Sequence, residues 1–257
     1  MRTLIRPAGA VAVLAVLSVL PTACADDARS PAAAGTTSEA TPVTVVESSV
    51  PAELDSGLTT KLGEVMDRFG VPGAVVALED PDLGSWVATA GVSDVESGEE
   101  MTTTLQWPIR SITKSFVVTV LWQLVQEGRV ALTDTVDRWV PGIPNGDRVT
   151  LGQLADMTSG VPDYTGEAFV EDFTADPTAP FTRAQLLDYV RRGEPSAAPG
   201  AERRYINAST VLLGEVIEQV EQRPFAEVLQ ERIAGPLSLA GTAYPNEVDG
   251  FTGEHPT

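Results

Sequence analysis

The chain of 257 residues is strongly acidic: 36 aspartate and glutamate residues oppose 17 lysine and arginine residues, for a formal net charge of −19. Nucleic-acid binding needs a basic face, so no nucleic-acid partner is expected. The single cysteine, Cys24, excludes an intrachain disulfide. The single histidine, His255, leaves too few ligands for a structural zinc site. We expect a globular protein that uses no metal and no other cofactor, and if it is a hydrolase, its base is not histidine.

Residues 1–23 predict a signal peptide for export. Arg2 and Arg6 precede an apolar run over residues 8–20, which is too short for a typical transmembrane helix. Two kinds of processing fit the end of this segment. Ala23-Cys24-Ala25 suits a cleavage site between small residues, whereas Pro-Thr-Ala-Cys resembles a bacterial lipoprotein box with lipidation at Cys24. With either kind of processing we expect the mature protein to be secreted. The position of the only cysteine favours lipidation, which would hold the protein on the extracellular face of the cell membrane through a lipid on Cys24 and through no other membrane contact.

Residues 24–50 are rich in alanine, serine, threonine and proline, a composition typical of a flexible linker. From Pro51 the pattern becomes periodic. It predicts an α+β fold with two strands and a helix-rich remainder. The expected elements are a helix over 54–69, strands over 73–78 and 86–92, a helix over 111–128, a short helix over 151–157, helices over 182–191 and 207–220, and a helix opened by Pro224 and ended by Gly235-Pro236. The helix over 111–128 is apolar nearly all round, which is typical of a buried helix.

Ser111 and Lys114 lie three residues apart at the start of this apolar helix, so they share one helix face. A serine hydroxyl becomes a good nucleophile when a base takes its proton, and a lysine amine can do so whereas arginine cannot. The chain has fifteen arginines and only two lysines, Lys61 and Lys114. The free backbone N–H of Ser111 at the helix start could also donate to an oxyanion. The alternative is a capping serine beside a solvated lysine.

A second pair follows at Tyr205 and Asn207. In an extended segment, residues two apart point to the same side. A phenol can relay protons, and a carboxamide can hold an amide substrate and a lysine. The alternative is that Asn207 caps the next helix and Tyr205 only packs.

Taken together, Ser111-Ile-Thr-Lys114 and Tyr205-Ile-Asn207 resemble motifs of the serine β-lactamase and penicillin-binding family, in its class C β-lactamase and D-alanyl-D-alanine carboxypeptidase branch. The likeness runs from about Pro72 to Pro245. It implies an antiparallel sheet flanked by helices plus an all-helical lobe. It also implies that Ser111 forms an acyl-enzyme, that Lys114 and Tyr205 share proton transfer, and that Asn207 orients the substrate and Lys114.

One departure from the family pattern concerns a third motif, Lys/His-Thr/Ser-Gly, which should follow Tyr-x-Asn by well over a hundred residues. Only fifty residues follow Asn207. We therefore expect residues 51–257 to be a β-lactamase-related catalytic domain that lacks its C-terminal strands, with weak or no turnover by this chain.

The expected function of the complete domain is that of an exported serine acyl hydrolase of D-alanyl-D-alanine carboxypeptidase type. Its expected substrate is a peptidoglycan stem peptide or a β-lactam. The alternatives are a β-lactamase or esterase of the same family, and a non-catalytic penicillin-recognising or wall-binding lipoprotein.

Overall fold

The computed structural model describes residues 14–15, 41–177 and 179–245. These divide into two compact units. The sheet unit ends at Pro108, and the helical unit begins at Ile109.

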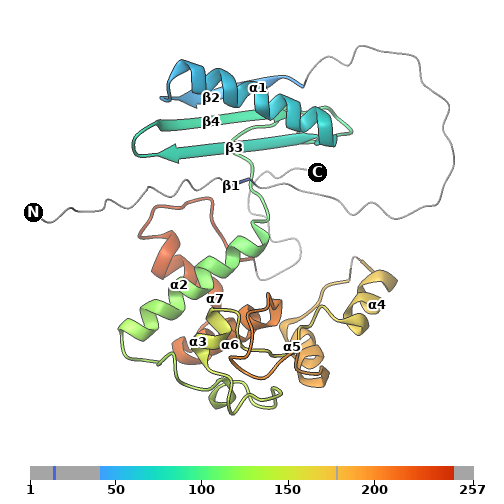
Figure 1. Ribbon diagram of the computed structural model, residues 1–257, viewed down its shortest axis with the longest axis vertical. Coiled ribbons are helices and arrows are strands. Elements are labelled where there is room, and N and C mark those ends of the chain that lie inside the picture. The colour runs from blue at the N-terminus through green and yellow to red at the C-terminus, as the bar shows by residue number, and fades with distance from the viewer. Residues whose placement is uncertain (1–13, 16–40, 178, 246–257) are drawn as a thin grey trace, which may run out of the picture. The chain divides into compact units, whose positions relative to one another are not determined.

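The sheet unit contains an antiparallel sheet in the order β1-β3-β4-β2 (Figure 1). The strands are β1 Leu14–Ala15, β2 Val43–Ser48, β3 Gly73–Asp80 and β4 Gly84–Gly91. A tight turn joins β3 to β4, with Asp80 paired to Gly84. The Asp80 carboxylate accepts hydrogen bonds from the backbone N–H groups of Asp82 and Leu83 at 2.9 and 2.8 Å, which stabilises the turn.

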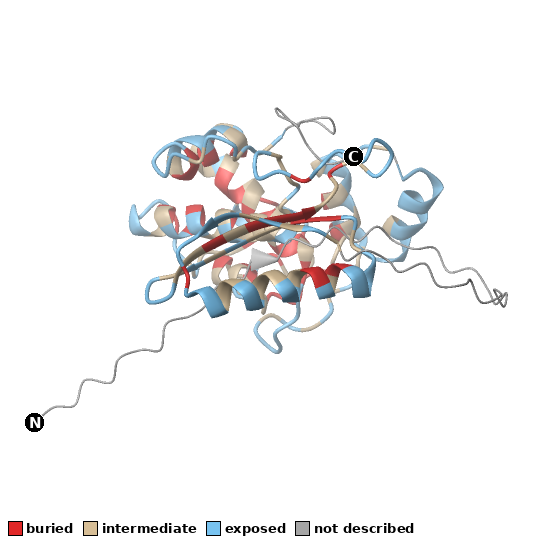
Figure 2. Ribbon diagram, turned by 90° about the horizontal axis from the view of Figure 1, so that it is seen from above, coloured by how far each residue is buried: buried red, intermediate tan, exposed pale blue. Residues whose placement is uncertain are grey.

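Helix α1, Ala52–Phe69, packs on one face of this sheet. Its leucines at positions 54, 58 and 62 recur at helical spacing and pack against a buried cluster formed by Val50 and by Trp86 and Ala88 of β4. Figure 2 shows buried residues along the sheet and on the side of α1 that faces it. Gly70 ends the helix in the left-handed conformation with φ 61°. The predicted helix and hairpin are thus present.

The predicted linker over residues 24–50 is wrong for its last part, because residues 43–48 form strand β2. Val43 and Val45 are two residues apart, so they share one face of the strand, and both pack against the buried cluster of Val50, Trp86 and Ala88. The sheet unit therefore has one long strand more than the two predicted. Leu14–Ala15, inside the predicted signal peptide, pairs with β3. The other residues of that peptide, and Cys24 after it, lie outside the described residues.

The described part of the helical unit contains seven main helical segments, among which α4 was not predicted. They are α2 Thr113–Gln126, α3 Leu151–Ala155, α4 Glu167–Ala175, α5 Arg183–Arg192, α6 Asn207–Glu221, α7 Phe225–Leu229 and the π-helical turn Gln230–Ala234, with 3₁₀ turns at Arg110–Ile112 and Val136–Arg138. Thr182 caps α5 as predicted, since its hydroxyl accepts a hydrogen bond from the Gln185 N–H.

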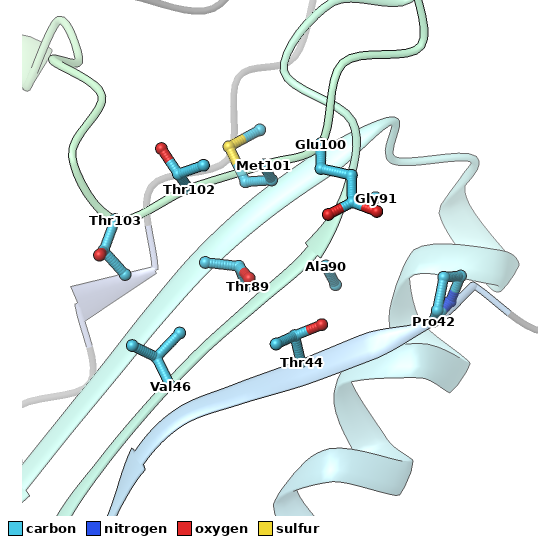
Figure 3. A pocket seen from close by; sticks show the side chains of 10 residues that line it. All are labelled: Pro42, Thr44, Val46, Thr89, Ala90, Gly91, Glu100, Met101, Thr102 and Thr103. Carbon is cyan, nitrogen blue, oxygen red and sulfur yellow. The ribbon is translucent and has the colours of Figure 1, made fainter.

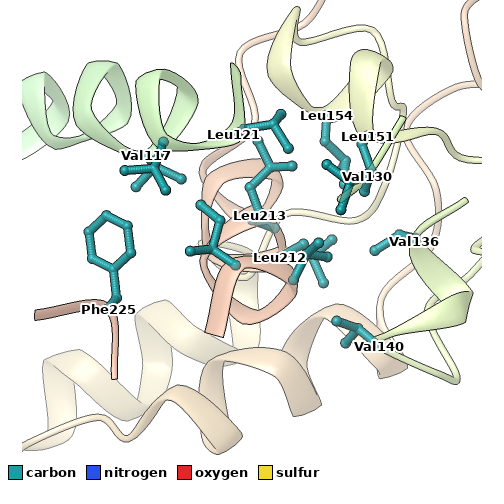
Figure 4. Packing of buried hydrophobic residues seen from close by; sticks show 14 of the residues in the cluster. Val117, Leu121, Val130, Val136, Val140, Leu151, Leu154, Leu212, Leu213 and Phe225 are labelled. Carbon is teal, nitrogen blue, oxygen red and sulfur yellow. The ribbon is translucent and has the colours of Figure 1, made fainter. Parts of the chain in front are cut away.

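The core of the helical unit lies between α2, α3 and α6 (Figure 4). Val117 and Leu121 of α2 are buried with Leu212 and Leu213 of α6. The expectation that α2 is buried all round is wrong for Trp122, which is 49% exposed. One face of α2 packs against α6, while Trp122 lies away from that face. None of the described helices is long and apolar enough to span a membrane. Together the two units confirm the predicted α+β class.

Candidate active site

Ser111 lies in a 3₁₀ turn, Arg110–Ile112, directly before α2. The preceding residue, Arg110, has φ 48°, a left-handed conformation that is uncommon for a residue other than glycine. The Ile112 N–H donates to the Ile109 carbonyl at 3.1 Å and closes the turn. Ser111 is exposed, and its backbone N–H has no hydrogen-bond acceptor among the described residues. The turn therefore presents both the hydroxyl and a free N–H donor.

Lys114 lies one helical turn later and links two parts of the site. Its Nζ donates to Ser111 Oγ at 3.3 Å and to Asn207 Oδ1 at 3.0 Å. Lys114 and Asn207 are 93 residues apart in sequence, and they meet because α2 packs against α6. The predicted common face of Ser111 and Lys114 is present, and no carboxylate forms an ion pair with Lys114 among the described residues.

Tyr205 lies two residues before α6 and contacts the same hydroxyl. Its OH donates to Ser111 Oγ at 2.7 Å, and the Lys114 Nζ lies 4.9 Å from the centre of its ring. Partial burial raises the pKa of Tyr205, but hydrogen bonding with Lys114 and Ser111 and the charge of Lys114 outweigh this, so that its pKa is lowered from the ordinary value near 10. The Tyr205 phenol is therefore closer to losing its proton than an ordinary tyrosine.

Asp163 holds Asn207, and the sequence did not single it out. Its Oδ2 accepts hydrogen bonds from the backbone N–H of Asn207 at 3.1 Å and from the Asn207 side-chain Nδ2 at 3.3 Å. Its Oδ1 accepts from the Ala208 N–H at 3.1 Å. The alternative that Asn207 caps α6 is therefore wrong: Asp163 satisfies the first N–H groups of α6, and the Asn207 carboxamide is free to bind Lys114.

The turn that carries Asp163 is fixed against α6 and against residues 196–205. The hydroxyls of Ser159 and Ser209, both fully buried, are 3.0 Å apart. Gly160 has φ 66°, and a Cβ there would lie 2.4 Å from the Ala197 carbonyl oxygen. Only glycine fits at this position, because both the backbone conformation and the close approach exclude a side chain. The Arg204 N–H donates to the Met157 carbonyl at 2.9 Å, which holds the segment before Tyr205 on the same turn.

A cavity of about 1120 Å³ opens at this cluster. Ser111, Lys114 and Asn207 line it, together with aromatic side chains that include Tyr164 and Phe181. Burial and the neighbouring charges of Asp163 and Tyr205 raise the pKa of Tyr164, so its hydroxyl stays a donor at neutral pH. The cavity thus adjoins a nucleophile, two groups that can exchange protons and an apolar wall.

A smaller hollow of about 300 Å³ lies on the sheet unit (Figure 3). Its lining is mostly threonine and apolar residues, and Glu100 is the one charged residue among the described residues that line it. It contains no lysine beside a hydroxyl. The Ser111 cluster is therefore the stronger candidate for chemistry.

The structure brings together the four residues that the sequence singled out on the globular part: Ser111, Lys114, Tyr205 and Asn207. It adds Asp163 and Arg110. Cys24 lies outside the described residues. The chemical roles of these side chains stay predictions.

Known proteins with similar sequences indicate the family to which this chain belongs. A family model described as Beta-lactamase matches residues 58–255. The D-alanyl-D-alanine-carboxypeptidase/endopeptidase AmpH of Escherichia coli K12 is 30% identical over 147 residues, which cover 55% of this chain and 37% of that protein.

Two solved structures also resemble this chain in sequence and in fold. A D-stereospecific amidohydrolase from Streptomyces sp. is 37% identical, with a TM-score of 0.59, over 66% of this chain and 51% of that one. A D-amino acid amidase from Ochrobactrum anthropi SV3 is 28% identical, with a TM-score of 0.64, over 73% and 52% of the two chains.

The chain spans about a third of the length of its curated relatives and about half of these solved chains. The family model nevertheless covers most of it. The order and contacts of the Ser111–Lys114 and Tyr205–Asn207 pairs agree with that match. The chain belongs to the beta-lactamase family, a family of serine hydrolases.

Proposed function

We propose that this protein is a serine acyl hydrolase that works through an acyl-enzyme on Ser111. The observation that carries the proposal is that Ser111 Oγ receives hydrogen bonds from both Tyr205 and Lys114, while Asn207 holds Lys114 in place. A hydroxyl placed between two groups that can exchange protons is the arrangement that activates a serine nucleophile.

In the proposed reaction Ser111 Oγ attacks the carbonyl carbon of an amide, and its proton moves to Tyr205 or Lys114 once that group is unprotonated. The Ser111 N–H donates to the developing oxyanion. The carbon–nitrogen bond then breaks, and the leaving nitrogen takes the proton. Water next attacks the ester, its proton passes to the same group, and the acid leaves as Ser111 recovers its proton.

The proposed substrate is a peptide that ends in D-alanyl-D-alanine, cleaved as by a carboxypeptidase. The similarity to AmpH, whose name states that activity, supports it, as does the similarity to a D-stereospecific amidohydrolase and to a D-amino acid amidase. All three names state hydrolysis of an amide or peptide bond in a substrate of D configuration. A β-lactam also presents an amide carbonyl, so β-lactamase activity is the outcome to separate from peptidase activity.

Labelling with a fluorescent penicillin, followed by intact-mass analysis, tests the acyl-enzyme. We expect one adduct, which is lost in Ser111→Ala and kept in Ser115→Ala. Ser115 is a matched control because it is exposed on α2, the helix that follows Ser111, and does not line the cavity. Absence of a Ser111-dependent adduct with the penicillin and with an activated neutral ester would refute the enzyme and favour a non-catalytic binding protein. Release of D-alanine compared with hydrolysis of a chromogenic cephalosporin then separates peptidase from β-lactamase.

We also propose that the protein acts outside the cytoplasm, anchored by a lipid on Cys24. The apolar run over residues 8–20 and the position of the only cysteine support this. In a bacterial host, Triton X-114 should extract the parent chain into the detergent phase and leave Cys24→Ser in the aqueous phase. If the parent chain and Cys24→Ser partitioned alike, the lipid anchor would be contradicted, and the proposed reaction at Ser111 would be unaffected.

A further inference from the structure

The cavity beside Ser111 differs in charge from the rest of the chain. Acidic residues outnumber basic residues about two to one in the sequence. The described residues that line the cavity nevertheless include three bases, Arg110, Lys114 and Arg183, and no aspartate or glutamate. A concave site with positive lining concentrates anions, because its walls of low dielectric focus the field. The charge of the lining therefore favours an anionic ligand.

The three bases are compensated to different degrees. Arg183 forms ion pairs with Glu215 and Glu218 of α6, so its charge is largely neutralised. Lys114 is held by the neutral groups of Ser111 and Asn207 and belongs to the proton-transfer machinery. Arg110 is exposed and has neither an ion pair nor a side-chain hydrogen bond to any described residue. Arg110 is thus the guanidinium that an incoming anion can pair with.

The position of Arg110 places its guanidinium charge beside the proposed nucleophile, Ser111. It precedes Ser111 directly, and its φ of 48° belongs to the turn that exposes the Ser111 hydroxyl. A long side chain in the left-handed region is strained, and such strain persists where the surrounding structure imposes it and often lies at functional sites. Arginine also pairs with a carboxylate through two parallel hydrogen bonds, which fixes its direction.

We propose that Arg110 binds a carboxylate of the substrate whose carbonyl is attacked by Ser111, so that the site selects acyl substrates with a negative charge close to the scissile bond. This inference rests on the proposed function, since it concerns the ligand of the same cavity. It assigns to Arg110 a role in specificity and none in proton transfer.

Binding of two peptides to the Ser111→Ala chain tests the proposal without turnover. The peptides are N-acetyl-D-alanyl-D-alanine and its C-terminal amide, which have nearly the same size and differ in charge. By isothermal titration calorimetry we expect the free acid to bind about tenfold more tightly, as is typical of a charge-assisted hydrogen bond. This preference should disappear when Arg110→Gln is added, and the affinity for the amide should change little.

Two further variants control for misfolding and for a general loss of positive charge. Arg110→Gly removes the guanidinium but accepts φ 48° without strain, so it should fold and lose the same preference. Arg138→Gln is the matched control: its side chain is 63% exposed and does not line the cavity, so the preference should remain. A preference that survives in both Arg110 variants, or no preference in the parent, would overturn the inference.

The proposed function is tested separately by an activated neutral ester, which needs no anion site. Acylation of Ser111 by this ester without any preference for the free acid would overturn the role of Arg110 and leave the hydrolase. A preference for the free acid that depends on Arg110, with no acylation by any reagent, would support the carboxylate site and refute the hydrolase.

Discussion

Asp163 accepts hydrogen bonds from both the backbone and the side-chain N–H groups of Asn207, at 3.1 and 3.3 Å. Because both bonds end on one carboxylate oxygen, they fix which end of the carboxamide faces Lys114. The Asn207 nitrogen is turned toward Asp163, and the oxygen is left to accept from Lys114 at 3.0 Å. One carboxylate thus caps α6 and orients a side chain of the active site.

The first prediction concerns Asp163→Ala. Loss of a helix cap costs about 1 kcal/mol in the free energy of unfolding, so urea denaturation should shift to lower concentration. Without its partner the Asn207 carboxamide can rotate, and we expect acylation of Ser111 to slow by about tenfold or more. Stopped-flow labelling measures the rate.

Asp188→Ala is the control for this variant, since Asp188 is exposed on α5 and pairs with Arg191 on the surface. A double variant with Asn207→Ala separates orientation from capping. If Asp163 acts on the rate through Asn207, its removal should slow acylation little further once Asn207 is absent. An equal rate loss in both backgrounds would contradict the positioning role.

The second prediction compares Lys114→Arg with Lys114→Ala. Arginine keeps the positive charge but cannot lose a proton, so both variants should lose acylation by about 100-fold or more. The other lysine, Lys61, is exposed on α1 with 69% of its side chain accessible, and Lys61→Arg should leave the rate unchanged. Near-normal acylation in Lys114→Arg would mean that Lys114 acts through its charge alone.

The third prediction concerns the pH dependence of acylation. Hydrogen bonding with Lys114 and Ser111 lowers the pKa of Tyr205 against the opposing effect of burial. Deprotonation makes the phenolate able to take the Ser111 proton, so the rate should rise with pH along a limb whose midpoint lies below 10. In Tyr205→Phe this limb should vanish and the rate near pH 8 should fall. Persistence of the same limb in Tyr205→Phe would assign it to another group.

Local patterns in the sequence predicted most of the helices and the β3–β4 hairpin. The three-residue spacing of Ser111 and Lys114 was enough to place them on one face, because a helix fixes that geometry. The meeting of Ser111 with Tyr205 depends on the packing of α2 against α6, and spacing alone could not give it. The contact between Ser111 and Tyr205 was predicted only from the resemblance to the serine β-lactamase and penicillin-binding family.

Asp163 and strand β2 were not predicted from the sequence, for different reasons. Asp163 caps α6 from 44 residues away, and a cap supplied from another segment leaves no signal beside the helix. The alternation in β2 is short and follows a segment rich in alanine, serine and threonine, so composition favoured a linker. A search for alternating valines from Pro42 onward could have found the strand.

The last prediction concerns Glu221 at the end of α6, whose side chain is 5% exposed. It accepts from Arg129 at 2.5 Å and from Arg232 at 2.7 Å, and thereby joins the end of α6 to the loop after α2 and to the π-helical turn. Glu221→Gln would leave these guanidinium groups beside a neutral amide. Removing one partner of a buried ion pair typically costs about 3 kcal/mol in the free energy of unfolding, so the urea midpoint should fall well below that of the parent. Glu227→Gln, on the exposed side of α7, should unfold like the parent. Equal midpoints for Glu221→Gln and Glu227→Gln would show that this cluster contributes little to stability, as is usual for exposed ion pairs.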